Sequence, residues 1–269
     1  MTHPALESRA PCLETDTGPM LPGLMAAHYD TIGVNYANLR KPDARIGKKI
    51  ADALGDAETV VNVGAGAGSY EPEDRAVTAV EPSAQMISQR AESDVAVIQG
   101  VAEDLPFDDN AFDAAMAVLT IHHWTDQAKG LAEMRRVSRG PVVLLTFDPQ
   151  YKEFWLLDYL PGLATLDDSQ MPKLPFYSEH LSDVEITTVP VPHDCSDGFM
   201  AAYWRRPAAY LDPKIRAAIS PFWALGDISE ELAKLERDLA SGAWAERYAE
   251  LLELDAYDAG YRLVRSAGP

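Results

Sequence analysis

Three glycines and one glutamate stand at spacings that suit a nucleoside ligand. Gly64, Gly66 and Gly68 directly follow the short apolar run Val60–Val63, and Glu81 ends the next apolar run. The first run predicts a buried strand that enters a tight turn. An acidic side chain at the tip of the following strand can hydrogen-bond the hydroxyls of a ribose. These residues therefore predict a nucleoside-binding half of an open α/β sheet, with a glycine turn that holds no ligand as the alternative.

The glycine spacing separates two classes of cofactor. A dinucleotide-binding loop has the spacing G-x-G-x-x-G, whose amides meet a pyrophosphate. This chain has G-x-G-x-G followed by Ser69 and Tyr70. That shorter spacing resembles motif I of the class I S-adenosylmethionine (SAM) dependent methyltransferases. In that family the loop passes under the amino-acid part of SAM and the acid after the second strand holds the ribose, which implies this role for Glu81.

Asn62 departs from the pattern of that family, which usually has Asp or Glu two residues before the first glycine. An amide can hydrogen-bond, but it cannot offer charge to the SAM ammonium. The departure is compatible with a second interpretation, in which the amine of SAM attacks its own sulfonium carbon and gives a cyclic amino acid plus methylthioadenosine. A third interpretation is a SAM-binding protein without turnover.

Further phrases of the same family follow in order. Gly100–Phe107 (GVAEDLPF) resembles the end of its third strand, where residues 102 and 103 edge the adenine. A strand-end loop supplies the backbone amide and the acceptor that adenine recognition needs. The phrase EMRRVSRGPVVLLTFDP resembles the region of the fifth strand, so the resemblance covers Ala27–Asp148. It implies a set of cofactor-binding residues: Tyr29, Asn62, Gly64, Gly66, Gly68, Glu81, Pro82, Ala102, Glu103 and Thr120.

Two adjacent histidines are the candidates for chemistry. His122 and His123 follow the apolar run Phe112–Ile121, a predicted central strand, and open α/β sheets bind ligands beyond the carboxyl ends of their strands. We expect His122 to be a general base or substrate holder, because imidazole titrates near neutrality. Neighbours on an extended chain point opposite ways, so His123 should face the next helix, and a zinc pair is disfavoured. Alternatively, one or both histidines only support that helix. Tyr36 and Arg205 are further candidates for substrate contact.

The elements that position these residues are read from apolar periodicity and from turn residues. An aromatic segment, 151–181, either forms a wall of a small-molecule pocket or packs against the rest of the protein without a role in binding. Asp197 is expected to cap the predicted helix Phe199–Arg206. A terminal strand should lie antiparallel beside Val184–Val189. The predicted helices are Arg45–Leu54, Ala84–Arg90, Leu131–Val137, Phe199–Arg206, Lys214–Trp223, Ser229–Ala240 and Ala243–Leu254, and the remaining strands are Val95–Ile98, Pro141–Phe147 and Gly260–Arg265.

Composition limits the functions that are possible. The formal charge of −19 argues against a nucleic-acid partner, because phosphate contacts need clustered Lys and Arg. Cys12 and Cys195 lie far apart, so a disulfide framework is not expected and a reducing cytoplasm fits. No apolar run approaches the roughly 20 residues of a membrane span, and the N-terminus lacks a signal-peptide core. We expect a cytoplasmic monomer or homodimer that binds no membrane and no metal.

The sequence as a whole predicts a seven-stranded, Rossmann-like class I methyltransferase sheet, with helices on both faces and a helical cap or insertion. The expected activity is SN2 transfer of a methyl group from SAM to a small-molecule metabolite or natural product, whose identity the sequence does not specify. We expect a loose N-terminal arm at residues 1–26 and the SAM-binding core at 27–198. The helical insertion is expected at 199–258 and the final core strand at 259–269.

Overall fold

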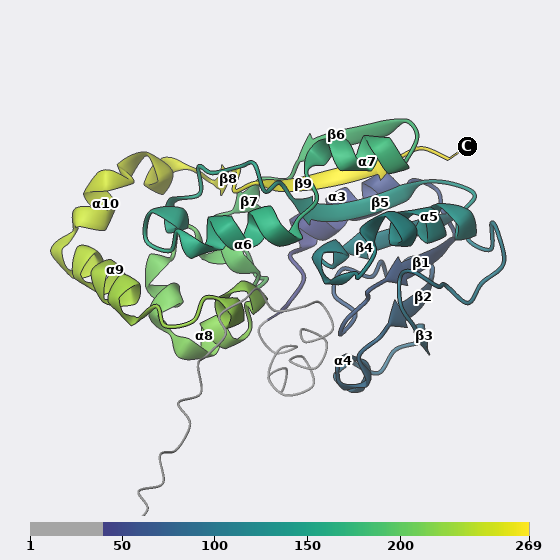
Figure 1. The fold of residues 1–269 in the computed structure, drawn as a ribbon, viewed down its shortest axis with the longest axis horizontal. Helices are drawn as coiled ribbons and strands as arrows, with labels where there is room; N and C mark the ends of the chain where they lie inside the picture. The colour runs from purple at the N-terminus through teal and green to yellow at the C-terminus, as the bar shows by residue number, and fades with distance from the viewer. Residues whose placement is uncertain (1–39, 269) are drawn as a thin grey trace, which may run out of the picture.

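The computed structural model describes residues 40–268, which form a mixed seven-stranded sheet in the order β3-β2-β1-β4-β5-β9-β6 (Figure 1). Its strands are β1 Thr59–Val63, β2 Ala76–Glu81, β3 Ala96–Gln99, β4 Ala114–Val118, β5 Val142–Phe147, β6 Val184–Thr188 and β9 Tyr261–Ser266. The strands pair in parallel except where β9 runs antiparallel to β5 and β6. The predicted fold class is confirmed, as is the pairing of the last strand with β6. The expectations for the N-terminal arm, Tyr29 and Tyr36 lie outside the described residues.

Helices cover both faces of the sheet because residues on a strand alternate between its two sides. Val60 of β1 packs in one buried cluster with Ile46 and Ile50 of helix α3, Ala44–Leu54. Its neighbour Val61 packs in a second cluster with Leu131 of helix α5, Gln127–Val137. The parallel strands β1 and β4 are thus buried on both sides, which is why they read as continuous apolar runs.

The remaining helices agree with the predictions near the sheet and differ in the C-terminal half. The expected helix Phe199–Arg206 is a short 3-10 turn, because Pro207 begins another turn directly after it. The expected helices Lys214–Trp223 and Ala243–Leu254 are each divided into an α-helix and a 3-10 turn. The α-helices are α4 Ala84–Ser88, α6 Gly162–Gln170, α7 Leu174–His180, α8 Pro213–Ala217, α9 Ser229–Ser241 and α10 Ala243–Arg247, and the 3-10 turns are η2 Ile121–His123, η3 Trp155–Asp158, η4 Met200–Tyr203, η5 Pro207–Leu211, η6 Ser220–Ala224 and η7 Ala249–Glu253.

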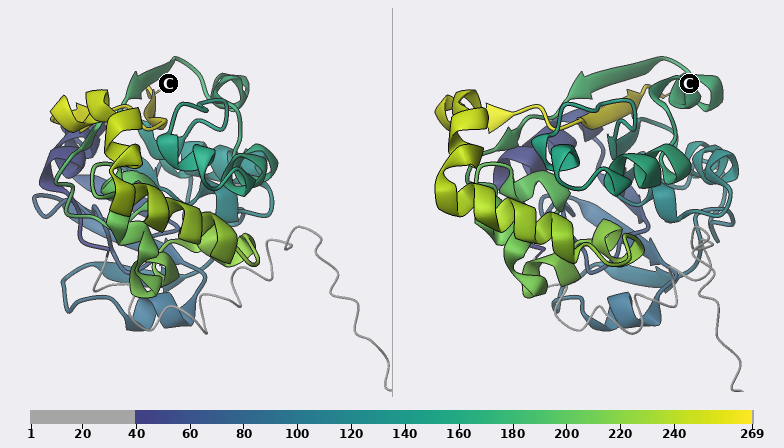
Figure 2. Two further views of the ribbon diagram at one scale, coloured as in Figure 1. Left: turned by 90° about the vertical axis from the view of Figure 1, so that its left-hand side faces the viewer. Right: turned by 60° about the vertical axis from the view of Figure 1, so that its left-hand side comes forward.

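The helices after β6 gather at one end of the molecule. Figure 1 shows α8, α9 and α10 away from β3 and α4, and the turned views of Figure 2 bring α9 and α10 in front of the sheet. β7 (Val191–Pro192) and β8 (Ala256–Tyr257) pair antiparallel and so bring together the two ends of this part of the chain. The division of the chain into a core and an insertion at the expected boundaries stays a prediction.

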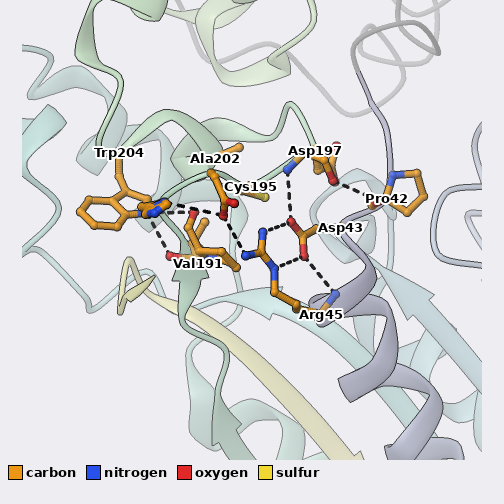
Figure 3. Close-up of polar contacts among 12 residues, drawn as sticks. Pro42, Asp43, Arg45, Val191, Cys195, Asp197, Ala202 and Trp204 are labelled. Carbon is orange, nitrogen blue, oxygen red and sulfur yellow. Dashed lines mark hydrogen bonds and ion pairs between the residues drawn. The ribbon is translucent and has the colours of Figure 1, made fainter. Parts of the chain in front are cut away.

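Polar contacts around the buried Asp43 carboxylate tie the start of α3 to the segment that follows β7 (Figure 3). The Asp43 carboxylate caps α3, pairs with the Arg45 guanidinium at 2.7 Å and accepts a hydrogen bond from the Ser196 backbone N–H at 3.2 Å. The hydrogen bond from Arg45 is the main reason why the pKa of Asp43 lies well below its usual range. Trp204, which is fully buried, donates its indole N–H to the Val191 carbonyl oxygen at 2.9 Å. The bond from Ser196 to Asp43 joins the N-terminal end of α3 to the segment after β7, and the bond from Trp204 to Val191 holds β7 against the end of turn η4.

Candidate functional site

The glycine loop after β1 folds tightly against the ends of β2 and β4. The N–H groups of Gly64 and Ala65 both donate to the carbonyl oxygen of Val80, at 2.9 and 3.1 Å. Gly64 has a φ of 69°, and a Cβ atom there would lie 2.2 Å from Oγ1 of Thr120. Glycine is therefore required at this position both by the backbone conformation and by the approach of Thr120, which follows β4.

Glu81, at the end of β2, holds this loop in place through hydrogen bonds. One carboxylate oxygen accepts a hydrogen bond from the Gly66 N–H at 2.8 Å, and the other accepts from the Ser83 N–H at 3.0 Å. Burial raises the pKa of Glu81, while those two N–H donors act in the opposite direction. The side chain that the sequence selects for the ribose thus also holds the loop in shape.

A pocket of about 220 Å³ opens above this loop at the carboxyl ends of the strands. Gly68 does not line it, and a Cβ at that position would lie within 3.2 Å of Glu71 and Arg90. Eight of the residues selected from the sequence do line the pocket: Asn62, Gly64, Gly66, Glu81, Pro82, Ala102, Glu103 and Thr120. Sequence reasoning did not select the other lining residues, among them Arg40, Ser83, Val101 and Trp124.

Glu103 has a structural role at the edge of this pocket. One of its carboxylate oxygens accepts hydrogen bonds from the Thr125 N–H, the Thr125 hydroxyl and the Asp126 N–H, at 2.6, 2.8 and 3.0 Å. These bonds tie the loop after β3 to the start of α5. Contact of Glu103 and of its buried neighbour Ala102 with adenine stays a prediction.

The two histidines lie side by side, so the expectation that they point in opposite directions is wrong. They occupy the 3-10 turn η2 rather than an extended chain, and their ring centroids are 3.9 Å apart. His123, expected to face the next helix, lines the first pocket, whereas His122 does not. Burial lowers the pKa of His122 to about 4, with a smaller contribution from the positive charge of Arg40. The expectation that this imidazole titrates near neutrality is therefore also wrong.

A second pocket, of about 100 Å³, adjoins the first and is bounded by the aromatic segment and by the helices after β7. Arg40, Leu119 and His123 line both pockets, and His122 lines the second. Leu119 follows β4 with a φ of 51°, a conformation that side chains with a Cβ rarely adopt. Most of the other lining residues are apolar: Phe147, Phe154, Leu157, Leu163, Leu166, Met171, Phe199, Met200, Ala201, Ile219 and Pro221.

Arg40 is anchored at the junction by Asp197, which sequence reasoning assigned to a helix cap. Asp197 accepts hydrogen bonds from Nε of Arg40 and from the hydroxyl of Tyr70, both at 2.8 Å, and its side chain is fully buried. The turn η4 that follows has no side-chain cap. Burial, reinforced by the charge of Asp197, raises the pKa of the Tyr70 hydroxyl.

Arg205 lies away from both pockets. Its guanidinium donates to the Leu254 carbonyl oxygen at 3.0 Å, and the residue lines neither cavity, so its selection as a substrate contact has no support in the structure. Within residues 40–268 there is no group of three or more His, Cys, Asp or Glu residues that could hold a metal ion. Over the same range, no helix has the length and apolar character to cross a membrane.

Known proteins resemble this chain in sequence and in fold. The family described as "Methyltransferase domain" matches residues 61–144. A crystal structure of a candidate methyltransferase from an antibiotic biosynthesis pathway of Anabaena variabilis ATCC 29413 is 36% identical, with a TM-score of 0.79, over 85% of this chain and 98% of that one.

Curated relatives match over shorter stretches. A chloroplastic 2-methyl-6-phytyl-1,4-hydroquinone methyltransferase of Oryza sativa subsp. japonica is 31% identical over 40% of this chain and 34% of its own length. A demethylmenaquinone methyltransferase of Renibacterium salmoninarum is 34% identical over 45% of this chain and 58% of its own. The chain spans about a third of the length of the first curated relatives that it matches. Together with the near-complete structural match, these similarities show that the chain belongs to the SAM-dependent methyltransferases.

Proposed function

We propose that the first pocket holds SAM and that the second pocket holds a small, largely apolar acceptor, which receives the methyl group. The observation that supports this proposal is the junction of the two pockets, since Arg40, Leu119 and His123 line both. When bound, SAM supplies an activated methyl group. The protein contributes alignment of the two reactants, which is worth about 7–11 kcal/mol in favourable cases.

The residues around the first pocket fit SAM. The side-chain oxygen of Asn62 is buried and has no hydrogen-bond partner within residues 40–268, although an unsatisfied buried acceptor costs about 1–3 kcal/mol. A ligand ammonium would satisfy it. Glu81 stands at the end of β2, where a ribose is expected, and no bulky side chain stands on the loop at Gly64–Ala67 that would fill the pocket from below.

The second pocket suits an acceptor that is apolar over most of its surface and polar at one edge. Its apolar lining comes from the aromatic segment, from the end of β5 and from the turns η4 and η6. Its polar lining residues are Arg40, His122, His123, Asp167, Gln170, Ser220 and Tyr261. A small hydrophobic molecule with one hydroxyl or other ionisable group matches this distribution.

Asp167 is the group best suited to receive a proton from such an acceptor. Burial raises its pKa to about 7, the neighbouring Asp168 adds to the rise, and Lys152 opposes it. A carboxyl group with a pKa near the working pH is an effective general base. His122, whose pKa is about 4, is neutral at pH 7 and serves in this proposal as a hydrogen-bond partner for the acceptor.

The curated relatives named for a hydroquinone and for demethylmenaquinone suggest which acceptors to test first. The experiment incubates the protein with SAM and a panel of hydroquinones, phenols and apolar carboxylic acids, and detects methylated products by mass spectrometry. Methylation of an apolar member, blocked when Leu163 or Ala201 is enlarged to Trp, supports the proposal. Methylation of only strongly charged, polar acceptors would contradict it.

The cyclisation of SAM remains the alternative reaction for the first pocket. That reaction needs a free amine as the nucleophile, and an amide oxygen such as that of Asn62 can accept a hydrogen bond from an amine as well as from an ammonium. Methyl transfer leaves S-adenosylhomocysteine and cyclisation leaves methylthioadenosine, so the products distinguish the two reactions.

A further inference from the structure

A buried ion pair lies behind the glycine loop, outside the set of residues that the family motif selects. The Arg90 guanidinium contacts the Glu71 carboxylate at 2.5 Å, and only 7% and 9% of the two side chains are exposed. Arg90 also donates to the Gly66 carbonyl oxygen at 3.3 Å, which attaches the pair to the loop. A Cβ on Gly68 would lie 3.1 Å from Glu71 and 3.2 Å from Arg90, so the pair packs closely against the loop.

This ion pair determines how the amide of Asn62 is oriented. The second carboxylate oxygen of Glu71 accepts a hydrogen bond from Nδ2 of Asn62 at 3.0 Å. An ionised carboxylate only accepts hydrogen bonds, so the nitrogen of the amide, and not its oxygen, must face Glu71. Oδ1 of Asn62 therefore faces away from Glu71. That oxygen is buried without a hydrogen-bond partner within residues 40–268, and Asn62 lines the first pocket.

We propose that Glu71, held by Arg90, is a positioning residue that directs the carbonyl oxygen of Asn62 into the first pocket as the acceptor for the ammonium of SAM. The inference rests on the proposed function only in placing SAM in that pocket. It explains how an amide stands where the family usually has an acid. The negative charge of the site lies one hydrogen bond away, on a carboxylate whose other oxygen is paired with an arginine.

Restoring the usual acid of the family motif at position 62 should weaken the binding of SAM rather than strengthen it. Asn62→Asp restores the usual acid, but the new carboxylate would face the carboxylate of Glu71 in a buried place, where like charges repel strongly. The substitution should therefore weaken the binding of SAM. In the double variant Asn62→Asp/Glu71→Gln, the new amide at position 71 can donate to the new carboxylate at position 62 while its carbonyl oxygen accepts from Arg90, so binding should recover.

Calorimetry on the full chain at pH 8 tests the proposal, with SAM, S-adenosylhomocysteine and methylthioadenosine as ligands. We expect Asn62→Asp to weaken binding of the first two by about tenfold or more, and the double variant to lie within about threefold of the wild type. Methylthioadenosine lacks the amino-acid part, so its affinity should be the same in all variants. Melting temperatures of the proteins without ligand control for loss of fold.

Three results would overturn the proposal. Asn62→Asp could bind SAM as tightly as the wild type or more tightly. The variants could lose methylthioadenosine affinity by the same factor, which would indicate a collapsed loop, or the double variant could bind no better than Asn62→Asp. The proposed function is judged separately, by whether the wild-type protein binds SAM and forms S-adenosylhomocysteine.

Discussion

The imidazole rings of His122 and His123 lie side by side, with their centroids 3.9 Å apart and their planes tilted by 48°. This pair stands where the two pockets meet, since His123 lines both and His122 lines the second. Burial lowers the pKa of each ring, that of His122 to about 4. Both rings are therefore neutral at physiological pH, and they can orient a ligand through hydrogen bonds without carrying charge.

The first prediction separates the two histidines. His122→Ala should leave SAM affinity unchanged and lower turnover by about tenfold, the effect of one lost hydrogen bond to the acceptor. His123→Ala should weaken SAM binding as well, because His123 also lines the first pocket. Calorimetry and steady-state kinetics measure the two effects.

Because His122 is neutral well below pH 7, its loss should lower the rate by the same factor at neutral and alkaline pH. Recovery at high pH would instead identify His122 as the proton acceptor.

A second prediction concerns Asp167 in catalysis. If its carboxylate accepts a proton from the acceptor, turnover of the wild-type protein should rise with pH through a pKa near 7 and then level off. Asp167→Asn should lower turnover by on the order of 10²-fold and abolish this rise, without changing SAM affinity. Asp168→Asn, at its more exposed neighbour, is the matched control and should keep the rise, displaced to lower pH because the charge of Asp168 helps to raise the pKa of Asp167. An unchanged profile in Asp167→Asn would place the base elsewhere.

A third prediction is a pH dependence of stability with opposite signs at His122 and Asp167. The pKa of His122 drops from 6.5 to about 4 on folding, so the unfolded chain binds more protons in this range and stability is lost as the pH falls through it. The pKa of Asp167 rises from 3.8 to about 7, so its contribution is present at low pH and is lost as the pH rises toward 7.

Urea unfolding of Asp167→Asn beside the wild type measures the contribution of Asp167. The variant lacks the titrating group and does not lose this stability. The free energy of unfolding of the variant minus that of the wild type should therefore be roughly 2 kcal/mol higher at pH 7 than at pH 5. A constant difference between the two pH values would mean that the carboxyl group titrates normally. His122→Asn should instead lose less stability than the wild type as the pH falls from 6.5 to about 4.

A fourth prediction follows from the two roles of Glu81. Glu81→Ala removes the acceptor of the Gly66 and Ser83 N–H groups as well as the proposed ribose contact. It should weaken SAM binding by about tenfold or more and also lower the melting temperature. Glu81→Gln, which keeps one acceptor oxygen, should lose less of both. If Glu81→Ala melts lower but binds SAM normally, Glu81 only supports the loop.

The sequence predicted the sheet and the position of the cofactor loop because these depend on local patterns. Apolar runs, glycine spacing and the acid at the end of β2 lie within short stretches of chain. The orientation of the histidines could not be predicted, because the 3-10 turn η2 stands where the apolar pattern indicates an extended chain. The contacts of Asn62 with Glu71, and of Asp197 with Arg40, were missed because they join side chains through the folded loop or across 157 positions of sequence. The one feature of the sequence that indicates an unusual contact at position 62 is Asn62 itself, which stands where the family usually has an acid.

The most direct test of methyl transfer follows the methyl carbon itself. The protein is incubated with SAM that carries a labelled methyl group and with the best acceptor from the panel, and all adenosine-containing products are identified by mass spectrometry. We expect label in the acceptor and an equal amount of unlabelled S-adenosylhomocysteine, with both lost when the second pocket is filled by Ala201→Trp. Label retained in methylthioadenosine, or no product although SAM binds, would contradict methyl transfer.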